Sequence, residues 1–307
     1  MAADKKTVKR EMRRLGGLWL LVIAAVCQIS AASHPQRVSA PAAQVKRIIS
    51  LVPAATEMLF AVGAGPRVVG VSSYDTYPPE VKTRPSVGAL IDPDVERILS
   101  LKPDLVVIYG TQSDLKQQLS RAGIAVFEYR HAGLADVTQT IRAIGERTGD
   151  KPQAEAVASR IERDLEGIRA KVRALQKPKT LLVFGREPRS LRGLYASGGV
   201  GFLNDMLETA GGANVFAGIR LQAVQASTEQ VLAAQPDVIL ETRSSSEAVP
   251  AGDRAAELEA WNTLASVPAV RNRQIFFLFD DRIVIPGPRV ADGTLLIARA
   301  LHPEAFK

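Results

Sequence analysis

The sequence predicts an α/β protein with two Rossmann-like lobes joined by a long, rigid helix. Short runs rich in valine and isoleucine alternate with amphipathic stretches from Arg47 onward, which is the pattern of parallel sheets covered by helices. One uninterrupted helical stretch, Pro152–Gln176, divides this pattern into two parts. The segment Glu-x-[Ile/Val]-Leu-x-x-x-Pro-Asp occurs once in each part, which indicates that the two lobes are related.

The N-terminal segment has the features of an export signal. A basic stretch precedes the apolar run Leu15–Val26, which is too short to span a bilayer comfortably. We therefore predict a signal peptide at 1–33, a linker at 34–45 and export from the cytoplasm. Cys27 is the only cysteine; it is either a lipid-attachment site or is removed with the signal, so the lobes are held together without disulfides.

The N-terminal lobe is predicted at 46–150 and contains four strand–helix units. The candidate strands are Arg47–Val52, Arg67–Ser72, Asp104–Tyr109 and Ile124–Tyr129. The candidate helices are Ala54–Val62, Pro93–Leu101, Ser113–Ala122 and Leu134–Arg147. Apolar runs of this length, bounded by turn residues, are typical of buried strands.

The interlobe helix is predicted at 151–177 and the C-terminal lobe at 178–307. Apolar residues of the interlobe segment recur at the spacing of one helical face, and its charges alternate along the rest of the surface. The candidate strands that follow are Thr180–Phe184, Asp237–Glu241 and Gln274–Phe279. The candidate helices are Gly201–Ala210, Thr228–Ala234, Ala255–Ser266 and Val290–Leu301.

The repeated segment places one glutamate, Glu96 or Glu229, in the first turn of a helix in each lobe. We expect Asp92-Pro93 to cap the first helix and Ser227 with Gln230 to form a capping box on the second, since these residue types satisfy free N–H groups at helix starts. One interpretation is that each carboxylate only complements the helix dipole. The other is that the two glutamates dock a basic partner.

Composition and motifs argue against several functional classes. The net charge is +7, and residues 1–33 hold six basic against two acidic residues, so the lobes show no basic block for nucleic acid. The histidines His34, His131 and His302 lack ligand spacing, so we predict no metal site. Phosphate-loop and nucleophile-elbow motifs are missing, and we interpret Asp280-Asp281 as a solvated pair. We therefore predict that the protein is not an enzyme, with an exported α/β enzyme as the competing class.

Several segments together resemble the periplasmic binding proteins of vitamin B12 ABC transporters, a group that also serves ferric siderophores and haem. The likeness runs from Arg47 to the C-terminal helix. The segments that carry it are Arg47–Glu57, Val69–Tyr74, Tyr77–Pro79, Val95–Ile98, Leu101–Val106, Tyr195–Gly198, Ala210–Phe216 and Ser227–Leu232. The resemblance implies a periplasmic location and the class III periplasmic binding protein fold, in which the interlobe helix limits hinge motion. We expect a monomer.

In this family the ligand lies in the cleft between the lobes, and paired glutamates meet arginines of the permease. The resemblance therefore favours docking of Glu96 and Glu229 onto an ABC permease with its ATPase. Carried over by motif, the ligand contacts are Tyr74, Tyr109, Tyr195 and Arg289. Arg186, with Arg189 and Arg192, lies near the predicted cleft and suits ligand carboxylates.

Two departures affect the expected ligand. The B12 binder has a tryptophan six residues before each repeat glutamate, whereas this chain has Leu90 and Ala223. Their loss removes stacking surface. The prediction is a corrinoid such as cobalamin, with haem or a ferric siderophore as the alternative, bound as a large metal-containing ligand without a resident cofactor.

Overall fold

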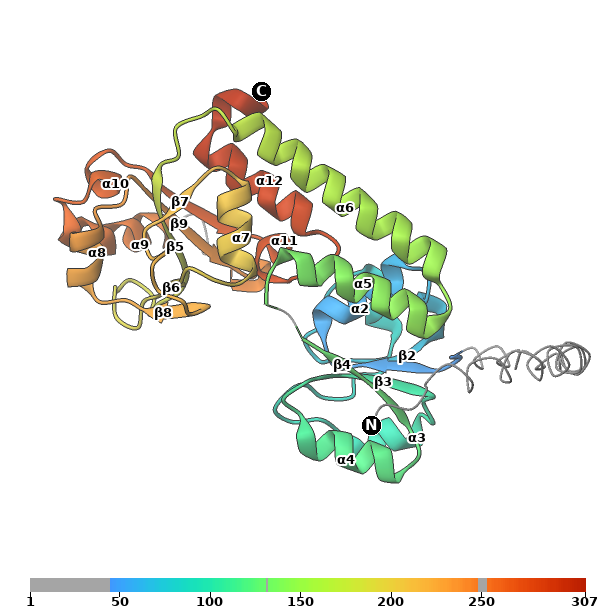
Figure 1. Cartoon of the computed structure of the whole chain (residues 1–307). Helices are drawn as coiled ribbons and strands as arrows, with labels where there is room; N and C mark the ends of the chain where they lie inside the picture. Colours follow the sequence, from blue (N-terminus) through green and yellow to red (C-terminus); the bar gives the residue numbers. More distant parts are fainter. Residues whose placement is uncertain (1–44, 131, 248–252) are drawn as a thin grey trace, which may run out of the picture. The chain divides into compact units, whose positions relative to one another are not determined.

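The computed structural model describes residues 45–130, 132–247 and 253–307. The predicted signal peptide, nearly all of the linker, Cys27 and His131 lie outside these residues. Contacts group residues 44–307 into one unit. The unit contains two sheets. The strands of one precede the longest described helix in the sequence, and the strands of the other follow it (Figure 1).

The N-terminal sheet is entirely parallel, as predicted. It contains β1 (Ile48–Ser50), β2 (Val68–Val71), β3 (Leu105–Tyr109) and β4 (Ala125–Tyr129) in the order β2-β1-β3-β4. Alternate residues face opposite sides, since Ile48 joins one hydrophobic cluster and Ile49 another. Both faces are therefore buried, which requires a layer of helices on each side.

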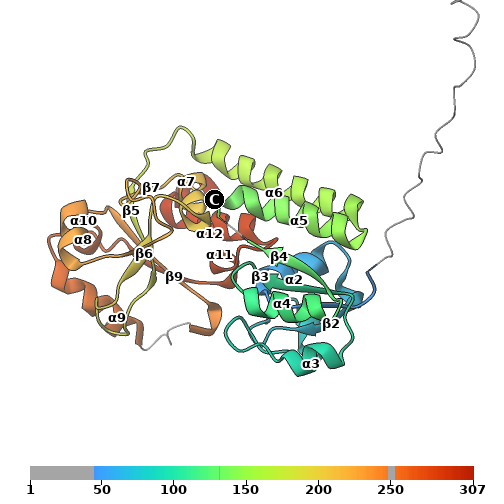
Figure 2. The same ribbon diagram turned by 60° about the horizontal axis from the view of Figure 1, so that its bottom comes forward.

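Helices cover the two faces in pairs (Figures 1 and 2). α2 (Pro53–Ala61) and α5 (Leu134–Thr148) pack with the cluster on the Ile48 side, whereas α3 (Val95–Ser100) and α4 (Ser113–Arg121) pack with that on the Ile49 side. The predicted cap of α3 was wrong. Asp94, not Asp92, caps this helix by accepting from Arg97 N at 2.9 Å, because Pro93 pairs with Gly88 in a tight turn.

The predicted long helix is α6 (Lys151–Val172), which packs beside α5 and α12 (Val290–Leu301). Both views place α6 along one side of the molecule, over elements of both lobes (Figures 1 and 2). One stripe of this helix is buried: Ala154, Ala158, Ile161, Leu165, Ile168 and Val172. The helix therefore contributes one apolar face to a core that reaches into both lobes.

The C-terminal sheet is mixed. Its parallel part is β10 (Ile275–Phe279), β9 (Val238–Arg243) and β5 (Lys179–Gly185), joined by β7 (Ala213–Asn214) on β5. β6 (Tyr195–Ser197) and β8 (Ala223–Gln225) extend it in antiparallel fashion. The sequence prediction found the three long strands but missed β6, β7 and β8.

The C-terminal helices also cover both faces of their sheet. α7 (Phe202–Thr209) and α12 pack on the side of α6. α8 (Thr228–Ala234), α9 (Arg254–Trp261) and α10 (Pro268–Arg271) pack on the other, and α11 (Asp281–Val284) follows β10. The predicted helix Ala255–Ser266 is shorter in the structure, because α9 ends at Trp261 and the chain continues as a 3₁₀ turn.

The 3₁₀ turns within the described residues are Gly65–Arg67, Pro79–Thr83, Ser245–Glu247, Asn262–Leu264 and Pro303–Phe306.

The repeated segment has the same structure in both lobes. Asp104 accepts the backbone N–H groups of Lys46 and Arg47 at 2.8 and 2.9 Å, and Asp237 accepts that of Lys179 at 3.0 Å. The residue before each proline, Lys102 or Gln235, has a φ of 46°. The Pro-Asp dipeptide thus ends a helix and ties the entry of its strand to the first strand of the lobe.

Candidate ligand-binding cleft

A cavity of about 500 Å³ lies between the two lobes. Its N-terminal wall comes from the loops that follow the carboxyl ends of β1, β2, β3 and β4, the usual position of a ligand in an open α/β sheet. Its C-terminal wall comes from the ends of β9 and β10. The lining residues are Pro53, Ala54, Ser73, Tyr74, Thr76, Tyr109, Tyr129, Phe202, Ser244, Ser246, Glu247, Asp281, Val284, Ile285 and Pro286.

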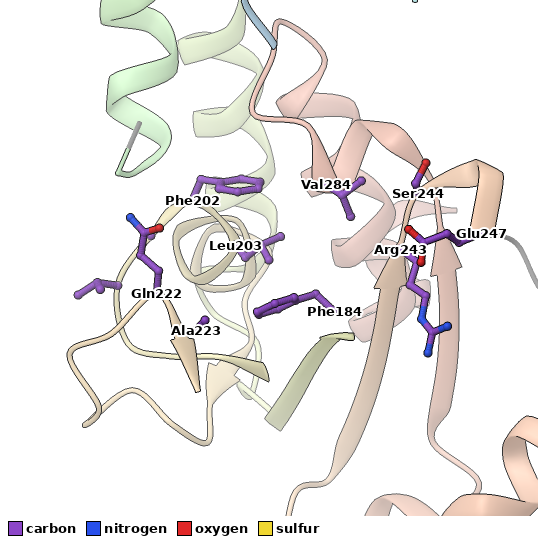
Figure 3. A pocket seen from close by; sticks show the side chains of 11 residues that line it. Phe184, Phe202, Leu203, Gln222, Ala223, Arg243, Ser244, Glu247 and Val284 are labelled. Carbon is purple, nitrogen blue, oxygen red and sulfur yellow. The ribbon is translucent and has the colours of Figure 1, made fainter. Parts of the chain in front are cut away.

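A second compartment of about 400 Å³ lies within the C-terminal lobe. Phe184, Phe202 and Leu203 lie on one side of it, and Arg243 and Ser244 lie on the other (Figure 3). The two cavities share Phe202, Ser244, Glu247 and Val284. They are therefore neighbouring parts of one cleft.

Aromatic side chains dominate the apolar lining. Tyr109 and Tyr129 meet edge to face with ring centroids 6.0 Å apart, and Tyr74 is 71% exposed. The structure thus brings Tyr74 and Tyr109 together in one cavity. Tyr195 lines neither cavity, but its ring lies 6.3 Å from that of Phe184, which lines the C-terminal compartment.

Sequence reasoning missed Tyr129, Phe184 and Phe202. Tyr129 ends β4 and pairs in register with Tyr109 at the end of β3, so the strand pattern carried a signal for it. Phe184 occupies the equivalent place near the end of β5. Phe202 follows the loop into α7, and no motif marked it.

Hydrogen bonds fix the acidic side of the cleft. Asp281 accepts from Ser244 Oγ and Ser245 Oγ, both at 2.7 Å, and from Ser245 N at 3.0 Å. Although burial raises the pKa of Asp281, these hydrogen bonds outweigh it and hold the pKa below its ordinary value. Asp280 instead pairs with Arg282 at 2.6 Å. The two aspartates therefore have structural partners, unlike the solvated pair that the sequence suggested.

A half-buried acid lies in the loop that forms one wall of the cavity. Asp75 accepts from Ser72 N at 2.6 Å and from Thr56 Oγ1 at 3.2 Å through one oxygen, while its Oδ1 has no partner within the described residues. Burial raises the pKa of Asp75 to about 7. Its neighbours Tyr74 and Thr76 face the cavity, so a group that changes charge near neutrality lies beside the cleft.

Arg289 lies near the cavity but is paired. Its Nε and Nη2 donate to Glu57 Oε2 and Oε1 at 2.9 and 2.5 Å. The guanidinium also lies over the Tyr77 ring, 3.9 Å from the centroid. Arg289 does not line either cavity. To contact a ligand directly, as the sequence led us to expect, its side chain would have to leave Glu57.

Arg186 has a different place from the one that the sequence suggested. Its side chain is fully buried, and its Nη2 lies 2.8 Å from both Glu241 Oε1 and Glu257 Oε2. Trp261 Nε1 donates to the same Glu241 oxygen at 2.6 Å. We therefore withdraw Arg186 as a ligand contact, since it is committed to a buried ion-pair network. Arg189 and Arg192 are exposed and pair with Asp253 and Glu187.

Of the two residues that replace the expected tryptophans, Ala223 lines the cleft and Leu90 lines neither cavity. Ala223 lines the C-terminal compartment, and Gln112 Nε2 donates to Leu90 O at 3.0 Å while its Oε1 accepts from Tyr109 N. Leu90 is thus linked to the wall that carries Tyr109. At Ala223 the smaller side chain leaves more space in the C-terminal compartment than an indole ring would.

Glu96 and Glu229 are exposed residues in the first turns of α3 and α8. The predicted capping box of α8 is confirmed, with Ser227 and Gln230 bonded reciprocally. Hydrogen bonds from its own N–H and from Ser227 lower the pKa of Glu229. Neither glutamate forms a salt bridge with any residue that the structure describes.

Comparison with known proteins identifies this architecture. The family model described as periplasmic binding protein matches residues 48–281. The chain belongs to this family. It is a substrate-binding protein of an ABC transporter and has the class III fold, in which one long helix joins the lobes. The family is one of transport proteins and not of enzymes.

The relatives include proteins with different ligands. The chain is 32% identical to an uncharacterized ABC transporter substrate-binding lipoprotein of Bacillus subtilis, over 85% of this chain and 82% of that protein. It is 32% identical to the vitamin B12-binding protein of Salmonella typhimurium, over 80% and 89%. The periplasmic haem-binding protein of Roseiflexus sp. RS-1 superposes with a TM-score of 0.71 and 29% identity, over 85% and 99%.

Two further observations concern the described residues. None of their helices combines the length and apolarity needed to cross a membrane. Nor do three or more of their histidine, cysteine, aspartate and glutamate side chains gather in a way that would hold a metal ion.

Proposed function

We propose that this protein captures a corrinoid, such as cobalamin, in the interlobe cleft and delivers it to the permease of an ABC importer. The observation that carries the proposal is the cavity between the lobes, with Tyr74, Tyr109 and Tyr129 on its N-terminal wall. Aromatic rings bury much area with few rotamers to freeze, which suits a large flat macrocycle. The similarity to vitamin B12-binding proteins over most of the chain supports this ligand.

The charges of the cleft favour a corrinoid over haem. The charged lining residues are Glu247, Asp281 and Arg243, and Arg243 lies 3.7 Å from the buried Glu241 carboxylate. Haem propionates would meet two carboxylates with little cationic compensation, whereas corrin amide groups donate hydrogen bonds to carboxylates. Haem or a ferric siderophore remains the alternative, supported by the likeness to the haem-binding structure.

Equilibrium dialysis of the purified protein against cobalamin, hemin and a ferric siderophore tests the proposal, because the three ligands are coloured. We expect saturable binding of cobalamin and an affinity loss on the order of tenfold in Tyr109→Ala, since a stacking ring is removed. Phe306→Ala, which removes an aromatic ring that lies against Lys171 and lines neither cavity, is the matched control. If none of the three ligands binds saturably, the ligand proposal is wrong.

We also propose that Glu96 and Glu229 dock the permease. Both are exposed, lie at equivalent positions of related lobes, and have no cationic partner among the described residues. The double variant E96R/E229R should keep its ligand affinity and lose stimulation of the transporter ATPase, because the charge at both contacts is reversed. The variant E80R/E259R makes the same net charge change at exposed sites elsewhere. Loss of ligand binding in E96R/E229R would instead indicate a structural role.

Export is part of the same proposal. The sequence signal predicts cleavage near Ser30–Ser33 or lipid attachment at Cys27. Mass spectrometry of the protein recovered from a Gram-negative host distinguishes the two, since lipid attachment leaves an acylated Cys27 as the first residue. An intact N-terminus at Met1 would contradict both.

A further inference from the structure

An ion pair between Glu57 and Arg289 links the two lobes directly, next to the interlobe cavity. Glu57 belongs to α2 of the N-terminal lobe, and Arg289 is the N-cap residue of α12 in the C-terminal lobe. The pair is bidentate, with distances of 2.9 and 2.5 Å. The Glu57 side chain is 3% exposed and that of Arg289 is 21% exposed.

Other contacts surround this pair from both lobes. Tyr77 of the N-terminal lobe lies against the guanidinium, 3.9 Å from ring centroid to Cζ. Gly287 lies so close to Glu57 that an added Cβ would come within 3.0 Å of Oε2. Tyr129 OH donates to Pro286 O at 3.5 Å. The segment 286–289 therefore fits against the N-terminal lobe at several points.

The pair is adjacent to the cavity wall without being part of it. Pro53 and Ala54 of α2 line the cavity, as do Ile285 and Pro286. Both partners of the pair thus continue from segments that form opposite walls. Separating these walls would leave a buried carboxylate without its cation, which is strongly unfavourable.

The charged neighbours do not offer Glu57 another cation. Asp281 faces the pair from α11, and Asp75 approaches Glu57 from the loop after β2. Burial raises the pKa of Glu57, and Arg289 offsets this only in part. The Glu57 carboxylate therefore depends on Arg289 for its compensation.

We propose that Glu57, Arg289 and Tyr77 form an interlobe latch that fixes the width of the ligand cavity. Arg289 then acts as a positioning residue and not as a ligand contact. The effect on ligand affinity rests on the proposed binding function, but the effect on the distance between the lobes does not.

Spin labels, one on each lobe, measure this distance. Ser120 in α4 and Ser266 after α9 are exposed, and the chain has no cysteine after Cys27, so S120C/S266C labels only these two positions once Cys27 is absent. Pulsed electron paramagnetic resonance without ligand should give a narrow distance distribution in this background. Adding Arg289→Gln should broaden it, as should Glu57→Gln, which keeps the shape of the side chain. An unchanged distribution in both variants overturns the latch.

The matched control is Arg67→Gln. Arg67 forms a similarly half-buried pair with Asp150 and donates to Val45 O and Thr148 O, all of them on the N-terminal side of the molecule. We expect Arg67→Gln to lower stability and leave the distance distribution narrow. A broadening equal to that of Arg289→Gln would show that general destabilisation is responsible, and the latch would be wrong.

Ligand affinity provides the second readout. Because a preorganised cavity binds more tightly, we expect Arg289→Gln to weaken cobalamin binding about tenfold, with Arg289→Lys between it and the parent. Weaker binding with an unchanged distance distribution would assign Arg289 to direct ligand contact and overturn the proposal. If no tested ligand binds the parent protein, the proposed ligand is wrong while the distance measurement still decides the latch.

Discussion

The two lobes share one structural unit and differ in how they complete it. Both contain a capped helix, a proline that ends it, and an aspartate that ties the next strand to the first strand of the lobe. The N-terminal lobe completes its sheet with parallel strands, and the C-terminal lobe adds the antiparallel β6 and β8. The unit that carries Glu96 and Glu229 is thus common to both lobes, while the rest of each sheet differs.

The lobes also differ in what they bury. The N-terminal sheet has apolar clusters on both faces, and the buried Glu57 and the half-buried Asp75 lie near the cleft. The C-terminal lobe buries Arg186 with Glu241, Glu257 and Trp261. Polar groups in the C-terminal core are therefore mutually compensated, whereas Asp75 lacks a cationic partner among the described residues. Three experiments test the comparison of the two lobes.

The largest effect is expected from Arg186→Met. This change leaves the buried Glu257 carboxylate without a cation and leaves Glu241 with only Arg243, at 3.7 Å. It should lower the free energy of unfolding by about 3–5 kcal/mol. Urea unfolding followed by circular dichroism measures it. Arg142→Met, which breaks an exposed pair with Glu155 and Glu162, should cost less than about 1 kcal/mol. Similar losses in both variants would show that the buried network has no special role.

Asp75→Asn is expected to have an intermediate, pH-dependent effect. Burial raises the pKa of Asp75 from an ordinary 3.8 to about 7 in the folded protein. The folded state therefore binds more protons than the unfolded state between these values, so this residue's contribution to stability is full below about pH 4 and falls as the pH rises through 7. Between pH 5 and pH 8 the parent should lose on the order of 2 kcal/mol relative to the variant. Urea unfolding at both pH values measures the difference, and a constant difference would contradict the raised pKa.

The smallest effect separates the two copies of the repeat. Asp104 accepts two backbone N–H groups and Asp237 accepts one. Asp104→Ala should therefore destabilise the protein by about 1–2 kcal/mol, and Asp237→Ala by about half as much, since exposed hydrogen bonds to a charged group contribute on this order. Thermal unfolding under identical conditions ranks the two. A larger loss in Asp237→Ala would reverse the comparison.

Much of the fold was predictable because its signals are local. The longer strands, α6 and the capping box of α8 follow from apolar spacing and cap residues. The strands β6, β7 and β8 have two or three residues each, too few to show a period. The cap at Asp94 was missed because the tight turn at Gly88 and Pro93 depends on how the chain packs.

The ligand-binding site was less predictable, because the role of each side chain depends on partners that are far away in the sequence. Tyr74 and Tyr109 reach the cleft as expected from strand ends and motif. Arg186 does not, because its acidic partners lie 55 and 71 residues away in the sequence. Arg289 likewise meets Glu57 across 232 residues. Charge marked Arg186 as a candidate and a family motif marked Arg289, but long-range pairing determines whether an arginine is free for a ligand.

The apolar stripe of α6 has a consequence for how the molecule unfolds. The cluster that it joins includes Ile48 and Leu105 from the N-terminal sheet together with Leu182 and Leu240 from the C-terminal sheet. Neither sheet can lose this packing without exposing apolar surface of the other, so melting should be cooperative across both. Calorimetry should therefore show a single endotherm, and a fragment ending before Pro178 should fail to fold alone.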